Sequence, residues 1–352
     1  MEPIAQVTAS TVSGEPRDPH GHGQGQRQGQ AAEHPGIRLL ALDLDGTLLH
    51  GADTFEGRFL SQRAIDAVRR AHDAGLKIVV STARPVSTGL AIVQRLAVDA
   101  CVYLNGALID FDPLCSTYES LTCGNTGDGS LVGIGFDARR ACEVCRMLTE
   151  RLPGLQCGIV MNDVRYTNFD VSVYWKTQTW RYTDFRFAGD AADGTCEGTG
   201  AGAPNSSTPQ AAGRHALGVP APVPAGTCDK LILFPERDQW DALRALVPDD
   251  FAVSISEGVM WMLMNPLANK AHSLGLVCDR LGIPMAQVAA FGDDLIDIPM
   301  MRAAGRGVAV ANANPEVLKV ADEICPSNDD DGVAQWIDGL LFGSRIYASQ
   351  KS

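Results

Sequence analysis

The sequence predicts an α/β protein, in which a doubly wound parallel sheet is interrupted by a second segment of mixed α+β structure. Two observations lead to this fold class. At both ends of the patterned region, short apolar runs alternate with segments of helical periodicity, the order in which crossover helices join parallel strands. Between these ends, residues 113–264 have strand patterns of their own, so we expect them to form a separate inserted part.

The first half of the predicted sheet begins with a short apolar run that ends in acidic residues. A segment of helical periodicity follows, with its apolar side chains on one face at Ala64, Ile65, Val68 and Ala71. A second apolar run comes next, and this strand, helix, strand order predicts parallel pairing with a right-handed crossover. The elements expected here are strand 37–43, helix 61–74, strand 76–82, helix 86–97 and strand 100–110.

The second half of the predicted sheet repeats this alternation near the C-terminal end. Its first helix begins at Lys270, where the preceding Asn269 can cap the helix with its side chain. The elements expected here are helix 270–281, strand 288–291, helix 297–304 and strand 307–310. Because both halves have the same alternation, we expect them to form one sheet.

The remaining segments lack the pattern of a packed core. Residues 1–34 are polar and repetitive, and residues 189–227 are rich in Gly, Ala, Pro and Ser, so a disordered tail and a flexible insertion are expected there. The predicted organisation is a tail at 1–34, the first part of the core at 35–112, an inserted α+β cap at 113–264, the second part of the core at 265–343 and a tail at 344–352.

Composition narrows the function classes. The 352 residues include 29 Lys and Arg against 42 Asp and Glu, a formal net charge of -13 that disfavours nucleic acid as a partner. No apolar stretch approaches the roughly 20 residues of a membrane-spanning helix. Ten cysteines are scattered through a long chain without a secretory n-region, which predicts a reducing, cytoplasmic location. Cys142 and Cys145 fall on the apolar face of a helical segment, where cysteine acts as a small hydrophobe.

The stretch "LLALDLDGTLLH" at 39–50 carries the strongest chemical signal. An apolar strand ends in Asp43 and Asp45, and residues two apart on an extended chain point to the same side. Two carboxylates in one small site repel each other unless a cation lies between them or one retains a proton. The pair therefore predicts a cation site.

Other polar residues follow the remaining predicted strands. Ligands of an open parallel sheet bind outside the carboxyl ends of its strands, so these residues are expected to meet Asp43 and Asp45. Lys270 belongs with them, because a lysine at a helix N-terminus is unfavourable unless an anion binds there. Carboxylates suit Mg²⁺, and a hydroxyl with an ammonium suits a phosphoryl group. The residues at the strand exits are Ser81, Thr82, Arg84, Asn105, Asp293, Asp294 and Asp297.

Four of these stretches, in this order, resemble the motifs of the haloacid dehalogenase (HAD) superfamily: "DLDGTLL" at 43–49, "VVSTARP" at 79–85, Lys270, and "GDDLIDIPMM" at 292–301. The sequence most resembles the Cof-type phosphatases, which carry a large α/β cap between the second and third motifs. The resemblance covers about residues 37–340 and implies a Rossmann-like core with an inserted cap.

The resemblance implies a role for each matching residue. Asp43 would take the phosphoryl group as an aspartyl-phosphate, and Asp45 would protonate the leaving oxygen and then activate water. Mg²⁺ would be held by Asp43, by the backbone carbonyl of Asp45 and by Asp293. Thr82 and Lys270 would hold the phosphoryl oxygens.

The same resemblance implies outer contacts. Arg84, Asn105, Gly106 and Asn328 would bind the phosphate or substrate, and Asp297 would orient Lys270 or a metal-bound water. The sequence departs from the family pattern at four positions where Gly or Asn is usual, and Ile296 is the departure most able to change the hydrogen bonds around the metal. These positions are Ala83, Asp294, Ile296 and Ala311.

We therefore expect a Mg²⁺-dependent phosphatase, monomeric or homodimeric, that acts on a small phosphorylated metabolite such as a sugar phosphate. The alternatives are a phosphomutase of the same superfamily and a phospho-accepting or metabolite-binding regulatory protein. In the cap, residues 164–182 predict a half-buried strand with an ordinary core face, in preference to contact with the leaving group. The side chains that such contact would involve are Arg165, Tyr166, Trp175 and Arg181.

Overall fold

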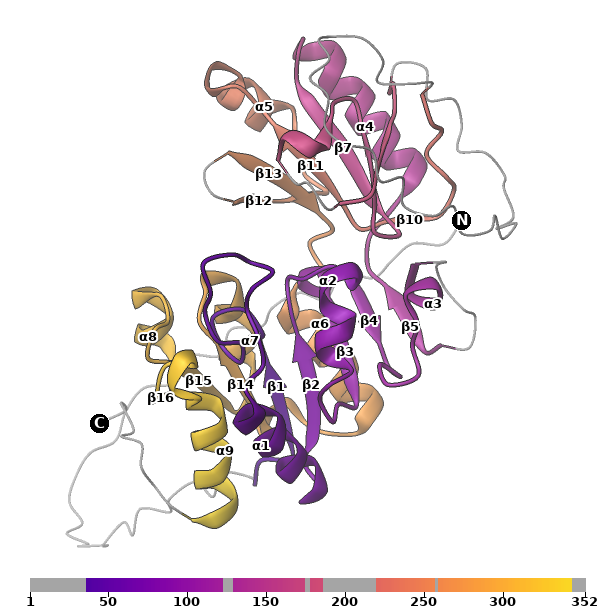
Figure 1. Cartoon of the computed structure of the whole chain (residues 1–352). Coiled ribbons are helices and arrows are strands. Elements are labelled where there is room, and N and C mark those ends of the chain that lie inside the picture. The colour runs from indigo at the N-terminus through magenta and orange to yellow at the C-terminus, as the bar shows by residue number, and fades with distance from the viewer. Residues whose placement is uncertain (1–35, 123–128, 175–177, 186–219, 257–258, 344–352) are drawn as a thin grey trace, which may run out of the picture. The chain divides into compact units, whose positions relative to one another are not determined.

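A central sheet of eight strands carries the N-terminal and C-terminal parts of the chain (Figure 1). The structure is a computed structural model, and it describes residues 36–122, 129–174, 178–185, 220–256 and 259–343, which belong to one compact unit. The predicted tails at 1–34 and 344–352 lie outside the described residues, as does the 189–219 part of the predicted insertion.

The eight strands lie in the order β16-β15-β14-β1-β2-β3-β4-β5. β1 is central, and it pairs in parallel with β14 on one side and with β2 on the other. The parallel sheet predicted from the two halves of the chain is therefore confirmed. The strands are β1 (Leu39–Leu42), β2 (Lys77–Ser81), β3 (Ala100–Tyr103), β4 (Leu108–Asp110), β5 (Leu131–Gly133), β14 (Val288–Gly292), β15 (Arg306–Val310) and β16 (Glu323–Cys325).

Helices cover both faces of this sheet. The step from β1 to β2 and the step from β14 to β15 run in opposite directions along the sheet, so right-handed crossovers place their helices on opposite faces. Figure 1 shows α1 and α9 together in front of the sheet and α6 behind it. The helices are α1 (Gln62–Asp73), α2 (Val86–Val93), α3 (Tyr118–Thr122), α6 (Lys270–Leu281), α7 (Ile298–Ala303), α8 (Pro315–Val320) and α9 (Gly332–Phe342).

Local sequence signals determine where two of these helices begin and end. The Ser61 side chain accepts a hydrogen bond from Ala64 N–H at the start of α1. The Asn269 side chain accepts one from His272 N–H at the start of α6, as predicted, and Gly282, which has φ 64°, caps the C-terminal end of α6. Capping places Lys270 in the first turn of α6, close to the ends of the central strands.

The strand predicted at 100–110 is wrong, because the chain reverses within it. β3 and β4 are antiparallel and are joined by a short 3₁₀ turn, η1 (Leu104–Gly106). Leu104 and Asn105 both have positive φ, at 53° and 59°, a left-handed geometry that does not continue a strand. The apolar pattern of this stretch shows no break, and only the Asn-Gly pair signals the turn.

A second sheet has six strands in the order β12-β13-β11-β7-β8-β9. The strands are β7 (Gln156–Met161), β8 (Val164–Thr167), β9 (Trp180–Tyr182), β11 (Lys230–Phe234), β12 (Ala252–Ser256) and β13 (Met260–Met264), with a separate pair of β6 (Phe136–Asp137) and β10 (Thr227–Cys228). The half-buried strand predicted within residues 164–182 ends early, because η2 (Val171–Val173) follows β8.

The helices α4 (Ala138–Arg151) and α5 (Trp240–Leu246) accompany this sheet. Cys142 and Cys145 are buried on α4 in its apolar core, as predicted, and the cysteines in the described part are free thiols. The remaining 3₁₀ turns are η3 (Arg237–Gln239), η4 (Met285–Gln287), η5 (Leu295–Asp297) and η6 (Asn328–Asp330).

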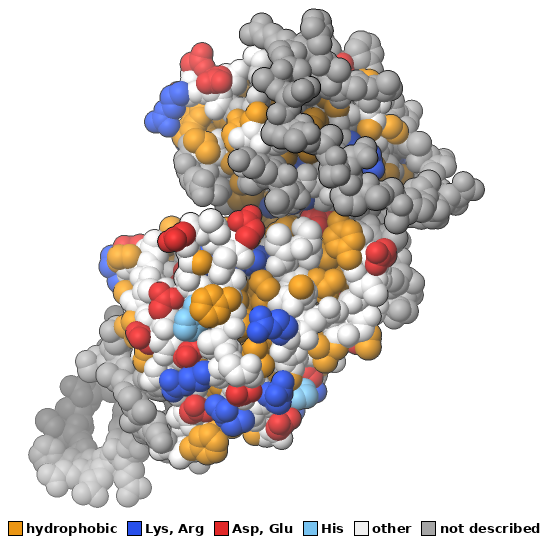
Figure 2. All heavy atoms as spheres, in the orientation of Figure 1, with side chains coloured by type: hydrophobic (Ala, Val, Ile, Leu, Met, Phe, Trp, Pro, Cys, Tyr) orange, Lys and Arg blue, Asp and Glu red, His pale blue; other side chains and the backbone are white. Residues whose placement is uncertain are grey.

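The surface of the described residues is mixed in charge. On the face visible in Figure 2, acidic and basic side chains are interspersed. Among the described residues, the helices are too short and too polar to cross a membrane.

Candidate active site

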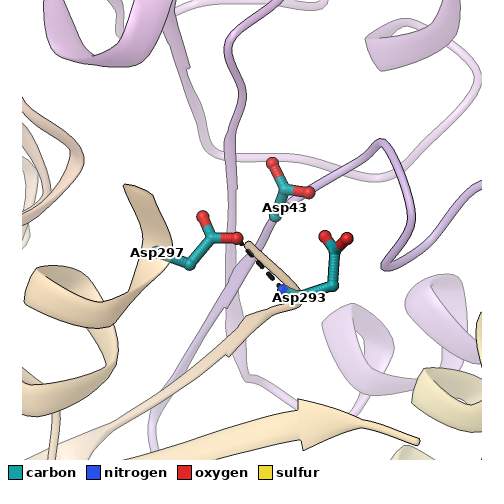
Figure 3. Close-up of side chains that lie close together, drawn as sticks. All are labelled: Asp43, Asp293 and Asp297. Atoms are coloured by element: carbon teal, nitrogen blue, oxygen red, sulfur yellow. Dashed lines mark hydrogen bonds between the residues drawn. The ribbon is translucent and has the colours of Figure 1, made fainter. Parts of the chain in front are cut away.

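Three carboxylates meet where the central strands end. Asp43 follows β1, Asp293 follows β14, and Asp297 ends η5. One oxygen from each lies within 4.8 Å of the other two, and Figure 3 shows the three side chains gathered at these strand ends. The carboxyl edge of a parallel sheet is the usual place for a ligand site. The structure thus brings together three of the acidic residues that the sequence singled out.

Lys270 reaches this cluster from the first turn of α6. Its Nζ lies 2.6 Å from Asp43 Oδ1 and 2.6 Å from Asp297 Oδ1, and the residue is only 2% exposed. Burial by itself would lower the pKa of Lys270, but attraction to Asp43 and Asp297 outweighs burial and raises the pKa above its ordinary value. Lys270 is therefore a fixed positive charge beside Asp43.

One ammonium does not neutralise the cluster. Burial raises the pKa of Asp43 well above its usual value, and repulsion by Asp297 and Asp293 adds to the rise that Lys270 opposes. Burial also raises the pKa of Asp293 to about 6, although its hydrogen bond from Thr47 lowers it. The carboxylates are short of positive charge, and hard carboxylate oxygens at this spacing fit a divalent cation such as Mg²⁺.

Neighbouring backbone and side chains orient the two acids from the fourth motif. Thr47 Oγ1 donates to Asp293 Oδ1 at 2.9 Å, and Asp297 Oδ2 accepts from the N–H groups of Asp293 and Asp294, both at 3.1 Å. Gly46 has φ 81°, and a Cβ at this position would lie 2.3 Å from Asp293 Oδ2. Glycine in the DLDGT stretch therefore leaves room for the Asp293 carboxylate.

Asp45 stands apart from this cluster and binds two arginines. Arg84 donates from Nε to Asp45 Oδ2 at 2.7 Å and from Nη2 to Asp45 Oδ1 at 2.6 Å, and Arg58 Nη1 lies 2.9 Å from Oδ1. The ring of Phe55 lies 4.1 Å from the Arg84 guanidinium carbon. The family resemblance implies that Arg84 binds the phosphate or substrate, and in the structure its guanidinium holds Asp45 with two bonds, the geometry that fixes a carboxylate most tightly.

Replacing Arg84 with lysine should reduce kcat/KM about 10- to 100-fold, because an ammonium cannot form the paired bonds that orient Asp45. We expect the loss in kcat rather than KM, together with a changed pH profile of kcat. The matched control is Arg95→Lys, since Arg95 is exposed. Unchanged kinetics in Arg84→Lys would show that Asp45 does not depend on this pair.

The other residues predicted to contact the phosphate or substrate include three that lie just after β2 and β3. Thr82 is fully buried, and its Oγ1 accepts from Arg84 N–H at 3.1 Å. Asn105 donates its N–H to the Thr82 carbonyl at 3.0 Å, and the buried Asn105 Oδ1 has no partner among the described residues. A Cβ on Gly106 would lie 2.6 Å from the Asn269 backbone, so Gly106 lets α6 begin beside this turn.

Asn328 joins two loops and does not line the cavity. Its Nδ2 donates to the Leu49 carbonyl at 2.8 Å, and its N–H donates to Asn312 Oδ1 at 2.9 Å. Asn312 in turn donates to the Gly46 carbonyl at 2.8 Å. Asn328 therefore holds the loop after β1 in place, through Leu49 directly and through Asn312 to Gly46.

A cavity of about 970 Å³ opens onto the acidic cluster. Asp43, Asp45, Asp293 and Asp297 line it, and so does Ile296, which is exposed where the family pattern has asparagine. Side chains from the second sheet complete the lining at Val160, Arg165, Lys230, Ile232 and Met260.

Sequence reasoning missed two of the charged residues at this cavity. Arg58 lies in the loop after β1, where no pattern marks it. Lys230 is the first residue of the apolar run "KLILF", a position where a lysine is common at the start of a strand. Its place directly before that run was the one sequence signal that could have indicated a role for this cation. Trp175, considered for contact with the leaving group, lies outside the described residues.

Comparison with known proteins identifies the class. The chain is 27% identical to the phosphatase YwpJ of Bacillus subtilis over 87% of this chain and 100% of that protein. It is 26% identical to a phosphoglycolate phosphatase of Pyrobaculum aerophilum over 87% of this chain and 96% of that protein. The solved structure of a HAD superfamily phosphatase from Bacteroides thetaiotaomicron has the same fold, with a TM-score of 0.61 and 22% identity over 90% of this chain and 99% of that chain.

The hydrolase family and the relatives named phosphatases show the class of the protein: it is a phosphatase, with an aspartate cluster and a lysine at the carboxyl edge of its sheet. The family model of the haloacid dehalogenase-like hydrolases matches residues 40–118 and 223–337. The chain belongs to this family, and the resemblance found in its motifs is confirmed.

Proposed function

We propose that the protein is a Mg²⁺-dependent phosphatase that hydrolyses a small phosphorylated metabolite through an aspartyl-phosphate on Asp43. The observation that carries this proposal is the meeting of Asp43, Asp293, Asp297 and Lys270 at the carboxyl edge of the sheet, next to a cavity of about 970 Å³. The relative named for phosphoglycolate acts on a small phosphorylated acid, which supports a substrate of this general kind.

Asp43 is the nucleophile in this proposal. Its Oδ1 accepts from Lys270, and its Oδ2 has no hydrogen-bond partner among the described residues, so Oδ2 would attack phosphorus. The new Asp43–phosphorus bond forms as the ester oxygen leaves and takes a proton from Asp45. Asp45 would then accept a proton from the water that hydrolyses the aspartyl-phosphate, so one carboxyl group serves both steps.

Lys270 and Asp297 would hold the charges of this reaction in place. Lys270 is buried and paired, so it supplies a preorganised positive charge beside the phosphoryl group. Thr82, adjacent to β2, would contribute a hydroxyl to the phosphoryl oxygens. Asp297 both binds Lys270 and accepts from two backbone N–H groups, and this arrangement orients the ammonium.

The donor set for Mg²⁺ comprises Asp43, the backbone carbonyl of Asp45 and Asp293. A bound divalent cation supplies the positive charge that this cluster lacks and neutralises phosphoryl oxygens. Thr47 and Gly46 would keep the Asp293 carboxylate turned toward this position.

Mg²⁺ should stabilise the protein more at about pH 8 than at about pH 5. The pKa of Asp293 is 3.8 without perturbation and about 6 in the folded protein. As the pH rises through this interval, the unfolded chain releases the Asp293 proton before the folded protein does. Asp293 therefore makes the folded protein less stable at higher pH until a cation binds its ionised carboxylate. The measurement is the shift in melting temperature between Mg²⁺ and EDTA at each pH. A shift that is equal at both pH values, or that persists in Asp293→Asn, contradicts the proposed donor set.

The proposed function is tested by phosphate release from a panel of phosphorylated sugars, polyols, sugar acids, nucleotides and coenzymes, with Mg²⁺ or with EDTA. We expect release from at least one small ester in Mg²⁺ and its loss in EDTA. Folded protein that releases phosphate from none of them contradicts the proposal, and phosphate transfer within a substrate without release would indicate a phosphomutase.

A further inference from the structure

Two cations lie side by side on the cavity face of the second sheet. β11 pairs with β7 so that Lys230 is opposite Val160, and β7 pairs with β8 so that Val160 is opposite Arg165. Residues directly opposite in antiparallel strands point to the same face. Lys230 and Arg165 therefore flank Val160 across three strands, and all three line the cavity that contains Asp43.

The protein leaves hydrogen-bonding capacity on both cations. Arg165 donates only through Nη1, to the Asp163 carbonyl at 2.6 Å and to Asp163 Oδ1 at 3.0 Å, so its Nε and Nη2 have no partner among the described residues. Within the residues that the structure describes, the only hydrogen bond of Lys230 Nζ is a weak one to Met262 Sδ, at 3.7 Å. An ammonium has three donors, and sulfur is a poor acceptor for them.

The two acids next to this pair lie outside the cavity lining. Asp163 and Asp229 interact with both cations, but neither lines the cavity. Asp163 is also engaged with the core, because its Oδ2 accepts from Ser87 N–H at 3.0 Å. Burial and the charge of Arg165 lower the pKa of Lys230 to about 8, because together they outweigh the attraction of Asp229 and Asp163.

We propose that Lys230 and Arg165 bind a second anionic group, a carboxylate or a phosphate, carried by the leaving group of the substrate. This inference rests on the proposed phosphatase function and narrows its substrate class to phosphate esters with a remote negative charge. One anion would fill the unused donors of both cations and remove the repulsion between them. The scissile phosphate would occupy the opposite, acidic side of the same cavity.

A further cavity residue favours a hydroxylated chain between the two anions. Gln178 lines the cavity, and its Oε1 is buried without a partner among the described residues. A hydroxyl of the substrate would donate to this oxygen. The cavity volume of about 970 Å³ also accommodates a chain longer than three carbons.

The test uses the full chain with Mg²⁺ and esters that differ at one group. In the six-carbon series these are glucitol 6-phosphate, gluconate 6-phosphate and glucitol 1,6-bisphosphate, and in the three-carbon series glycerol 3-phosphate and 3-phosphoglycerate. We expect kcat/KM to favour an anionic member over its neutral partner by about tenfold or more. The better of the carboxylate and the phosphate identifies the anion.

Variants then assign the preference to this pair. Lys230→Met, which keeps the length of the side chain, should lower the ratio of kcat/KM for the anionic ester over the neutral ester by about tenfold. Lys230→Arg should retain most of the ratio, and Lys319→Met, at an exposed surface position, should leave the ratio unchanged.

Each outcome decides the inference. Turnover with no preference for an anionic ester in either series would overturn it and leave the proposed function intact. Equal losses on neutral and anionic esters in Lys230→Met would also overturn it, since they would show that Lys230 acts on cap placement instead. Absence of Mg²⁺-dependent turnover on every ester would overturn the proposed function and this inference with it.

Discussion

Asp43→Asn should reduce phosphate release by at least about 10⁴-fold, because the amide cannot attack phosphorus and no other group takes over a nucleophile's role. The side chain changes little in size, and Lys270 keeps its second bond to Asp297 at 2.6 Å, so the variant should remain folded. The measurement is kcat/KM with the best ester of the panel, together with a melting curve. Wild-type enzyme quenched in acid during turnover should carry an alkali-labile phosphoryl group on Asp43.

Asp294→Asn is the matched control for this substitution. The substitution makes the same change from carboxylate to amide at a residue next to the cluster. The Asp294 side chain caps η5 by accepting from Leu295 N–H at 2.7 Å, and an amide oxygen can keep that bond. We expect its activity to stay within about threefold of the wild type. Activity above about 1% in Asp43→Asn, with Asp294→Asn unchanged, would assign the nucleophile to another group.

Lys270→Met should have the second largest effect, on both stability and rate. The substitution leaves Asp43 and Asp297 buried without their cation, and removing one partner of a buried ion pair costs about 3 to 5 kcal/mol of unfolding free energy. Loss of a preorganised charge at the phosphoryl group should reduce kcat by about 10²- to 10³-fold. Urea unfolding in EDTA and steady-state kinetics in Mg²⁺ measure the two effects.

The destabilisation in Lys270→Met should be larger at about pH 8 than at about pH 5, because the buried acids can take up protons at the lower pH. Lys319→Met serves as the control, since the Lys319 side chain is 66% exposed and pairs with Glu316 one turn away. It should change the unfolding free energy by less than about 0.5 kcal/mol. Equal stability of Lys270→Met and Lys319→Met would contradict the view that Lys270 neutralises the cluster.

Much of the site could be predicted because it lies at points where local signals are strong. Asp43 and Asp293 each follow a short apolar strand, and a parallel sheet must bring such strand ends to one edge. Lys270 follows an asparagine cap, so the start of α6 was readable from two residues. The family resemblance then connected these points in one order.

The break between β3 and β4 was not predictable from apolar pattern alone. Apolar residues lie on both sides of the Asn-Gly pair within residues 100–110, and the turn depends on left-handed backbone at Leu104 and Asn105. Gly106 is needed there because the backbone of Asn269, more than 160 residues away in the chain, packs against it. A contact of that range leaves no periodic signal in the sequence.

The roles of the arginines also depended on tertiary contacts. Arg84 follows the second motif, which suggested a phosphate contact, but the structure places Asp45 within reach of both its Nε and its Nη2. Arg58, in the loop after β1, meets the same carboxylate. An arginine binds the anion that lies nearest to its guanidinium in the folded protein, and the sequence does not show the distance between the two groups.

By itself, the sequence determined the α/β class, the carboxyl-edge position of Asp43 and Asp293, and the family, because strand exits, caps and motif order are local properties. Only the tertiary structure decided that Asp297 shares Lys270 with Asp43, that Arg84 holds Asp45, and that Lys230 and Arg165 face the same cavity. These pairings join residues from different strands and loops. Their energies depend on burial and on distances of a few ångströms, which are set when the sheets and helices pack.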